Sequence, residues 1–400
     1  MIRAVAPLIA RRFPTAPPDG LLAAVLLAFL ATAGFFYVNI MAALVAGLVE
    51  GLGFSEGDAG RVGSMNIYGA ALGALAAVAI VSRVRWRAFA VFALIGLMTI
   101  DALSIFVTTP GALMAIRFLH GCVGGMLVGV AYSVFARTRT PDRVFGMLLV
   151  IQYGLGGLGI MLLPRLVPVY GHGVLFGALF AFSLVTLLML PFLDSYPRGR
   201  VVRLAASGGI RFGLLAAAVV SVFLFQAGNM GLAANMLGFA RHSGLDADFA
   251  SAALGGATWV GIAGCAAVVV FGTRFGRTWP LVIGTILTIA GTLAFHWGGS
   301  QAVYLAANCA TSITWSFVIA YLLGLCAEFD QSGRTAALGG FLSKMGLATG
   351  PFAAAWLLDS GDYSTLINIS AIALAASVPV MFVPARALDR DKGAKGERPL

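Results

Sequence analysis

Long apolar segments joined by short, charged connections constrain this chain more than any other feature of its sequence. Twelve such segments occupy residues 21–47, 59–82, 88–107, 110–136, 144–164, 173–193, 212–239, 249–272, 279–297, 301–327, 335–358 and 364–385. A helix needs about 20 mostly apolar residues to cross the hydrocarbon core of a bilayer, and lipid leaves only helices and closed barrels as structures that satisfy the backbone. The sequence therefore predicts an all-α membrane protein with twelve transmembrane helices in contact with a lipid bilayer.

Composition excludes an ordinary soluble domain. Hydrophobic residues fill 60% of the 400 positions and charged residues 10%, whereas soluble domains carry about 25% charged residues. The first apolar run is too long for the core of a signal peptide, which spans about 7 to 15 residues, so we expect it to remain as the first helix. The cysteines lie inside apolar runs without metal-ligand spacing, so we predict no disulfide, metal or cofactor. They are Cys122, Cys265, Cys309 and Cys326.

The arginines fall on alternate connections, which is the pattern that orientation in a membrane produces. One set comprises the basic ends of the chain (Arg3, Arg11, Arg12, Lys392, Lys395, Arg398) and Arg83, Arg85, Arg87, Arg137, Arg139, Arg143, Arg198, Arg200, Arg203, Arg211, Arg274, Arg277 and Arg334. The opposite connections hold only Arg61, Arg165 and Arg241. The positive-inside rule then predicts that both termini are cytoplasmic. The net charge of +10 therefore needs no nucleic-acid partner. Scarce lysine beside abundant alanine and arginine points to a bacterial inner (plasma) membrane.

The chain repeats itself at one constant offset of 191 positions. This shift superposes Arg83 on Arg274, Gly159 on Gly350, and Arg117 on Asn308. Six helices per repeat return the second copy to the same orientation, as in the large two-half transporters. We therefore predict an N-terminal half at residues 1–194, a cytoplasmic linker at 195–211, and a C-terminal half at 212–400 with a short basic tail.

Several motifs resemble those of the major facilitator superfamily. The connection around Ser82, Arg83 and Arg85, and its copy Gly272-Thr273-Arg274-Phe275-Gly276-Arg277, are similar to the family's Gly-x-x-x-Asp-Arg-x-Gly-Arg-Arg loop, although both lack the acid. Arg117-Phe118-Leu119-His120-Gly121 resembles the family's Arg-x-x-x-Gly motif, and Gly346-x-x-x-Gly350-Pro351 is similar to a glycine-rich helix of the family. The resemblance implies two rocking six-helix halves, with Arg83, Arg274 and Arg277 in gating loops.

Three ionisable residues inside neighbouring apolar segments form a candidate proton-coupling site. Asp101 lies near the outer end of the 88–107 segment, and Arg117 lies at a similar depth in the 110–136 segment, so we expect the two to pair. His120 shares the helix face of Arg117 because it is three residues further on. Asp101 or His120 is a candidate proton acceptor. The alternative is that Asp101 and Arg117 form a structural clamp.

Lys344 lies near the middle of the 335–358 segment and has no obvious acidic partner. Charged residues inside a membrane normally face a partner or a water-filled path. An anionic group on a substrate would supply such a partner. The alternative is that the long side chain snorkels towards the cytoplasmic side.

Further polar residues are candidate substrate-binding groups. Asn308, Thr311 and Trp315 share one face of the 301–327 segment, and Gln226 and Asn229 share one face of the 212–239 segment. The resemblance places these segments and the first one, with Tyr37 and Asn39, around the central path. Lys344 and Arg117 complete the predicted binding residues. Each polar group could instead join neighbouring helices, a contact worth about 1 to 2 kcal/mol or less.

Together these features predict a secondary active transporter for a small organic solute. An organic anion such as a carboxylate, coupled to protons, is the leading hypothesis, and a proton-driven drug or metabolite efflux antiporter or a transporter of neutral, sugar-like solutes is the alternative. The sequence has no phosphate-binding loop for ATP. It also lacks the paired acids, metal cluster or serine–histidine arrangement that an enzyme would need, so we expect no catalytic residues. We expect the protein to act as a monomer.

Overall fold

The computed structural model describes residues 14–81, 83–138, 141–196, 211–272, 274–329, 334–359 and 361–394, and within these ranges the regular structure is helical. The N-terminal helices are α1 (Leu21–Ala33), α2 (Phe36–Asn39), α3 (Met41–Leu52), α4 (Glu56–Ile80), α5 (Trp86–Ser104), α6 (Pro110–Phe135), α7 (Pro141–Tyr170), α8 (Gly173–Met189) and the 3₁₀ turn η1 (Leu190–Phe192). The C-terminal helices are α9 (Phe212–Ala233), α10 (Met236–His242), α11 (Ala247–Val260), α12 (Ile262–Phe271), α13 (Thr278–Ala294), the 3₁₀ turn η2 (Phe295–Trp297), α14 (Gln301–Ala327), α15 (Arg334–Leu358) and α16 (Tyr363–Ala394).

The prediction of an all-α membrane fold is confirmed. Ten helices or joined helix pairs of the described chain are long and apolar enough to cross a membrane. The broken first segment and α15 account for the other two predicted spans. Several predicted positions lie outside the described residues: Arg3, Arg11, Arg12, Ser82, Arg139, Arg198, Arg200, Arg203, Thr273, Lys395, Arg398 and most of the 195–211 linker.

Some predicted helix boundaries were wrong. The first segment reaches Leu52 and is interrupted on both sides of α2. The interruption at Gly34 coincides with a close approach to α6, because a Cβ atom on Gly34 would lie 2.3 Å from the backbone oxygen of Gly124. The last segment extends as far as Ala394, beyond the end at residue 385 that hydropathy indicated.

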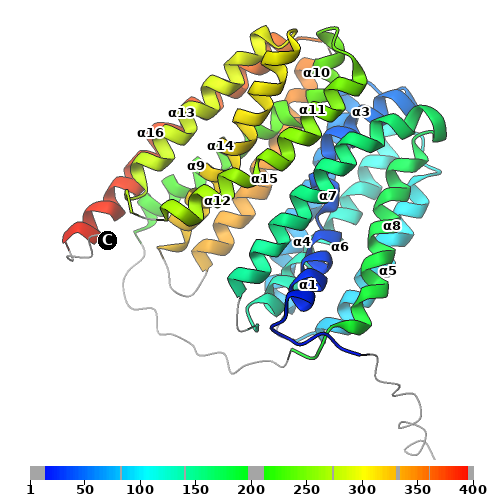
Figure 1. Ribbon diagram of the computed structural model, residues 1–400, viewed down its shortest axis with the longest axis horizontal. Helices are drawn as coiled ribbons and strands as arrows, with labels where there is room; N and C mark the ends of the chain where they lie inside the picture. Colours follow the sequence, from blue (N-terminus) through cyan, green and yellow to red (C-terminus); the bar gives the residue numbers. More distant parts are fainter. Residues whose placement is uncertain are drawn as a thin grey trace, which may run out of the picture.

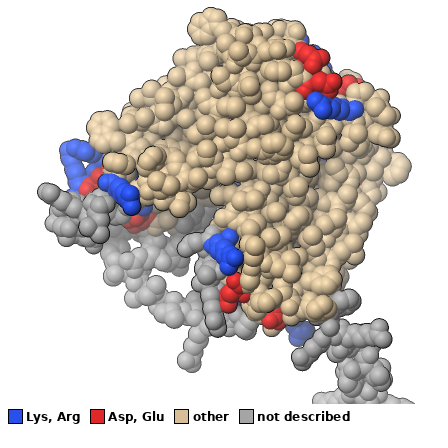
Figure 2. Space-filling view, in the orientation of Figure 1, with Lys and Arg blue, Asp and Glu red and all other residues tan. Residues whose placement is uncertain are grey.

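The helices form two groups, α1–α8 and α9–α16, which we call the N-terminal and C-terminal halves (Figure 1). Helix α4 packs against α15, and α7 packs against α11, so these pairs join the halves. In Figure 1 the two groups converge at the end opposite the chain termini, which we call the far end, and diverge at the terminal end. Figure 2 shows one face of the molecule, on which charged residues lie towards the two ends and the broad middle is uncharged. This distribution suits a surface surrounded by lipid.

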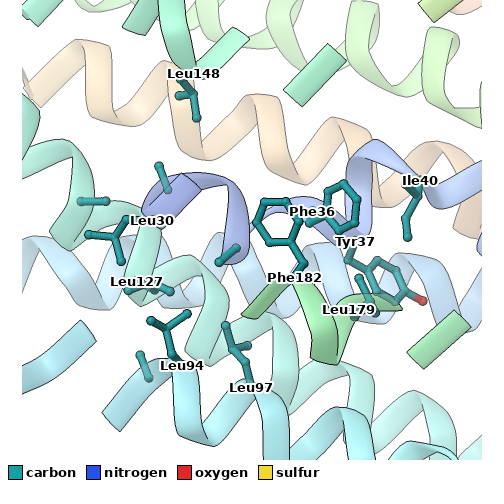
Figure 3. Close-up of a cluster of buried hydrophobic side chains, with 14 of the residues drawn as sticks. Leu30, Phe36, Tyr37, Ile40, Leu94, Leu97, Leu127, Leu148, Leu179 and Phe182 are labelled. Atoms are coloured by element: carbon teal, nitrogen blue, oxygen red, sulfur yellow. The ribbon is translucent and has the colours of Figure 1, made fainter. Parts of the chain in front are cut away.

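Two kinds of packing hold the N-terminal half together. Large apolar side chains from α1, α2, α5, α6 and α8, including Leu30, Phe36, Leu97, Leu127 and Phe182, form a buried cluster (Figure 3). Helices α4 and α6 instead approach through small residues, which supply close backbone contact where lipid offers no hydrophobic drive. We call this α4–α6 contact the glycine seam; its glycines are Gly69, Gly73, Gly121 and Gly125.

Candidate functional site

A cavity of about 400 Å³ lies between the two halves. The N-terminal half lines it with residues from the interrupted first segment and from α7, including Asn39, Gln152 and Tyr153. The C-terminal half lines it mainly with α9, α11, α12 and α14, including Asn308 and Trp315. Among the described residues that line it, none carries a carboxylate, an ammonium, a guanidinium or an imidazole group. The wall is therefore apolar with a few neutral polar groups, as in many small-molecule sites.

Most of the hydrogen-bond donors in this wall are already used by acceptors within the protein. The two amides donate to carbonyls one turn earlier in their own helices, Asn229 Nδ2 to Phe225 (2.9 Å) and Asn308 Nδ2 to Tyr304 (2.8 Å). The hydroxyls do the same in Thr311, which donates to the Ala307 carbonyl (2.8 Å), and in Thr258, which donates to the Leu254 carbonyl (2.9 Å). Ser316 Oγ donates to the Gly261 carbonyl (2.7 Å). The amide oxygens of Asn229 and Asn308 keep their capacity to accept. Asn39 Nδ2, in contrast, is a buried donor without a partner in the described chain.

A second polar site, which we call the buried polar cluster, lies within the N-terminal half and consists of Asn66, Asp101, Ser104, Arg117 and His120. The predicted ion pair is present: Arg117 donates to Asp101 Oδ1 at 2.8 Å, and both side chains are completely buried. Arg117 also donates to Ser104 Oγ and to the carbonyl of Ile100. These bonds offset part of the desolvation of the pair, while Arg117 Nε and Asp101 Oδ2 have no partner in the described chain.

The hydrogen bonds of Asn66 fix the tautomer of His120. Asn66 Nδ2 donates to the Arg117 carbonyl at 3.1 Å, and the same nitrogen lies 2.9 Å from His120 Nδ1. Because an amide NH₂ group only donates, His120 Nδ1 must accept and therefore carries no proton. The ring proton is then on Nε2, which faces Asp101 Oδ1 at 3.3 Å. This arrangement keeps His120 neutral, whereas Asp101 Oδ2 remains without a partner in the described chain.

The four-residue helix α2 connects the cluster with the cavity. Tyr37 is buried against the cluster, with its ring centroid 6.2 Å from that of His120 and 5.9 Å from the guanidinium carbon of Arg117. Two residues further on, Asn39 lines the cavity. Residues two positions apart on a helix point in different directions, so these neighbouring side chains serve two different sites.

The C-terminal half places its polar residues around Trp315. The indole Nε1 of Trp315 donates to Gln226 Oε1 at 2.7 Å, and Gln226 Nε2 donates to Ser343 Oγ at 2.8 Å. Lys344, the next residue on α15, is half-buried, and its Nζ lies 5.3 Å from the ring centroid of Phe35, which lines the cavity. Within the described chain, no carboxylate forms an ion pair with Lys344.

Bonds between the halves cluster at the far end. Arg61 of α4 donates to Asp359 Oδ2 at 2.6 Å, and Ser55 donates to Asp359 Oδ1 at 3.1 Å. Arg165 of α7 pairs with Asp248 at 2.8 Å. A further bond at this end joins Tyr363 to Glu56, while Trp259 with the Gly154 carbonyl and Tyr68 with Thr349 join the halves further along the helices. The far end is therefore closed in this conformation.

Solved structures of membrane transporters share this architecture. The nucleoside transporter NupG superposes with a TM-score of 0.66 at 16% identity, covering 91% of this chain and 98% of that chain. A D-xylose-proton symporter gives a TM-score of 0.67 at 13% identity, covering 90% and 97%. The human organic anion transporter MFSD10 gives 0.65 at 16% identity, covering 92% and 100%. No protein-family model and no curated protein sequence matches this chain.

The chain has the major facilitator superfamily fold. Within this fold, five of the predicted binding residues line the cavity: Asn39, Asn229, Asn308, Thr311 and Trp315. Four do not. Arg117 belongs to the buried polar cluster, Tyr37 packs against that cluster, Gln226 lies behind Trp315, and Lys344 lies beside Phe35.

The superfamily's loop arginines occupy the terminal end of the fold. Arg83 and Arg274 are exposed. Arg277 is held by two hydrogen bonds, which it donates to the Gly324 carbonyl at 2.7 Å and to Glu328 at 2.6 Å. Asp389 of α16 accepts from the backbone N–H groups of Arg277 and Thr278 at the start of α13. A carboxylate therefore does lie at this loop, although it comes from another helix.

The sequence analysis did not identify several residues that belong to these sites. Asn66 belongs to a segment whose glycines dominate its pattern, and Asp389 lies beyond the predicted end of the last helix. Tyr153 lines the cavity from α7. For Asn66, and for Gln152 in the cavity wall, there was a signal, since each is an amide inside an apolar segment, where polar groups are rare.

Proposed function

We propose that this chain is a secondary active transporter that moves a small organic solute across a membrane by rocking its two halves. The observation that carries this proposal is the cavity between the halves, because residues from both halves line it and bonds at the far end close it on one side. We assign the far end to the outside and the termini to the cytoplasm of a bacterial inner membrane. A monomer suffices, since one chain supplies both walls.

The cavity wall favours a neutral solute. A charged solute would lose hydration on entry without meeting an opposite charge among the described lining residues, which costs several kcal/mol per ion. A solute that donates hydrogen bonds suits the acceptor oxygens of Asn229 and Asn308. Such a site fits the sugar-like or metabolite alternative of the sequence analysis, for uptake or for efflux.

An organic anion is the second candidate, because Lys344 lies behind Phe35 without a paired carboxylate in the described chain. Rotation of the Phe35 ring would open a path from the cavity to the ammonium group. An ammonium 4 Å from a carboxylate gains about 4 kcal/mol at an effective dielectric constant of 20. The neighbouring structures include transporters of nucleosides, D-xylose and organic anions, so the fold alone does not choose between these solutes.

A matched pair of probes separates the two candidates. Benzamide and benzoate have the same ring and nearly the same shape and differ in charge. We expect reconstituted protein in proteoliposomes to take up benzamide in preference to benzoate, and Lys344→Gln to leave benzamide uptake near normal. Preference for benzoate that disappears in Lys344→Gln and partly returns in Lys344→Arg would establish the anion alternative instead. Uptake of neither probe above protein-free liposomes would count against the proposed solute classes.

Proton coupling belongs to the same proposal, with Asp101 as the acceptor. Its Oδ2 is free of partners in the described chain, whereas Asn66 occupies the nitrogen through which His120 would take a proton. The variant Asp101→Asn should exchange solute down its gradient but lose accumulation driven by an imposed pH gradient. His120→Gln should retain that accumulation. Accumulation that survives in the double variant Asp101→Asn with His120→Gln would show that another group or ion drives transport.

A further inference from the structure

The amide of Gln226 holds three helices together behind the cavity wall. Gln226 lies on α9, Trp315 on α14 and Ser343 on α15, and the amide bonds to both partners. Gln226 is 2% exposed and does not line the cavity, whereas Trp315 does. A solute in the cavity therefore meets the tryptophan and not the glutamine.

The orientation of this amide is fixed by its partners. An indole N–H can only donate, so the oxygen of Gln226 must face Trp315 and the nitrogen must face Ser343. The bond lengths of 2.7 and 2.8 Å are those of well-formed hydrogen bonds. Because Gln226 is buried and does not line the cavity, a solute there does not reach its remaining donor and acceptor.

Close packing of α9 against α15 keeps Gln226 in this position. A Cβ atom on Gly346 would lie 2.8 Å from Gln226 Cβ and 2.5 Å from the Phe223 oxygen. A Cβ atom on Gly350 would lie 2.4 Å from the Ala227 oxygen. The two glycines of the Gly346-x-x-x-Gly350 motif thus bring the helix of Gln226 to the distance that the bond to Ser343 requires.

The bond from Trp315 to Gln226 also removes the only polar group of the indole from the cavity. A solute in the cavity can therefore contact the flat ring of Trp315 but not its N–H group. We propose that Gln226 is a positioning residue that fixes the Trp315 ring, and that the cavity thereby selects a neutral solute with a flat ring. This inference rests on the proposed function, since it specifies the solute of the same cavity.

The first test measures the position of Trp315 without any transport. Trp86, Trp259, Trp279, Trp297 and Trp356 are replaced by phenylalanine, so that fluorescence reports Trp315 alone. Gln226→Met removes both hydrogen bonds at nearly constant volume and should lower the fluorescence anisotropy and increase quenching by acrylamide. Gln226→Glu, which keeps an oxygen for the indole, should restore both values. Gln152→Met, the same change at a lining residue of the other half, should leave them unaltered. If the fivefold replacement does not fold, the difference between the native chain and Trp315→Phe supplies the same signal.

The second test measures selectivity by binding. Benzamide should bind more tightly than cyclohexanecarboxamide, which has the same amide but no flat ring, by about two- to tenfold, the range of a single aromatic contact. Gln226→Met should abolish this ratio, and in a Trp315→Phe background it should have no further effect.

Unchanged anisotropy in Gln226→Met would overturn the positioning role. Equal binding of the two amides by the native protein, or no binding of either, would overturn the flat-ring solute. Neither result requires transport, so a failure of the proposed transport activity is distinguishable from a failure of this inference.

Discussion

At the scale of single residues, several polar groups of this chain are held where lipid and apolar side chains exclude water. Asp101 and Arg117 are completely buried and are joined by an ion pair on neighbouring helices. The pair carries extra bonds to Ser104 and to the Ile100 carbonyl, and the guanidinium carbon lies 5.0 Å from the ring centroid of Phe176. Such a pair contributes little net stability when intact, but removal of one member leaves a buried charge without compensation.

We therefore expect Arg117→Gln to destabilise the protein by about 3 to 5 kcal/mol, and the double change Asp101→Asn with Arg117→Gln to restore much of that loss. The yield and melting temperature of detergent-solubilised protein measure the loss of stability in Arg117→Gln and its recovery in the double variant. Asn308→Ala is the control, since Asn308 occupies the corresponding repeat position and bonds only within its own helix. A double variant no more stable than Arg117→Gln would mean that charge pairing is not the reason for the loss.

At the scale of helices, two contacts determine how the sites are held. The first is the glycine seam, in which a Cβ atom on Gly121 would lie 1.9 Å from the backbone oxygen of Asn66. The seam thus holds Asn66 beside His120. The second is Asp389, which accepts hydrogen bonds from the first N–H groups of α13 and from the Thr278 hydroxyl at 2.6 Å. An acid at a helix N-terminus is favoured by both the free donors and the helix dipole.

Gly121→Ala should destabilise the protein by about 1 to 3 kcal/mol, because real Cβ atoms do not approach within 3.0 Å and α4 and α6 must separate. Gly177→Ala is the matched control in α8. No described atom lies within 4 Å of a Cβ atom built there, so this change should be neutral or stabilising. Melting temperatures of the two variants test the seam directly, and equal shifts would argue against it.

Asp389→Ala should cost about 1 to 2 kcal/mol through loss of the cap on α13. Asp391→Ala is the comparison, because Asp391 pairs with Arg211 on a solvent-exposed surface, where ion pairs contribute about 0 to 1 kcal/mol. Thermal unfolding measures the loss of stability in each of the two variants. Hydrogen exchange at the start of α13 measures how much this helix end opens. Exchange at α13 that does not change in Asp389→Ala would show that the carboxylate does not stabilise this helix end.

At the scale of the whole molecule, the far-end bonds join the two halves on one side of the cavity, and in the proposed rocking mechanism they would stabilise the far-end-closed arrangement. Arg61 and Asp359 pair across the halves with side chains 25% and 42% exposed, so this pair is expected to contribute about 0 to 1 kcal/mol. A contribution of that size changes a two-state population by up to about fivefold. Ser55 adds a second bond to the same carboxylate.

Asp359→Asn should therefore shift the population away from the far-end-closed arrangement. Cys265 lines the cavity and serves as a native reporter after the other three cysteines are replaced by serine. Its reaction with a membrane-impermeant thiol reagent should increase from the far side and decrease from the terminal side, as measured in vesicles of both orientations. Asp58→Asn, which removes a partner of Arg61 within one half, is the control and should change neither rate. Equal effects of both variants would exclude a gating role for the inter-half pair.

The sequence by itself determined the fold class, because the length and hydropathy of each segment fix whether it can cross a bilayer, and this requires no knowledge of its neighbours. It also predicted the pairing of Asp101 with Arg117, since two charges at similar depth on adjacent helices have few other ways to avoid lipid. These are properties of single segments or of segments that follow each other in the chain.

Only the tertiary structure decided which polar residues reach the cavity and which serve other side chains. Gln226 and Asn229 share a helix face, yet Gln226 is bonded behind Trp315 and Asn229 lines the cavity. Tyr37 packs against the buried polar cluster whereas Asn39 lines the cavity, and Asp389 reaches α13 from the end of another helix. The physical reason is that the partner of a side chain depends on helix rotation and separation. These are set by glycine contacts between segments far apart in the chain, which the periodicity of one segment does not contain.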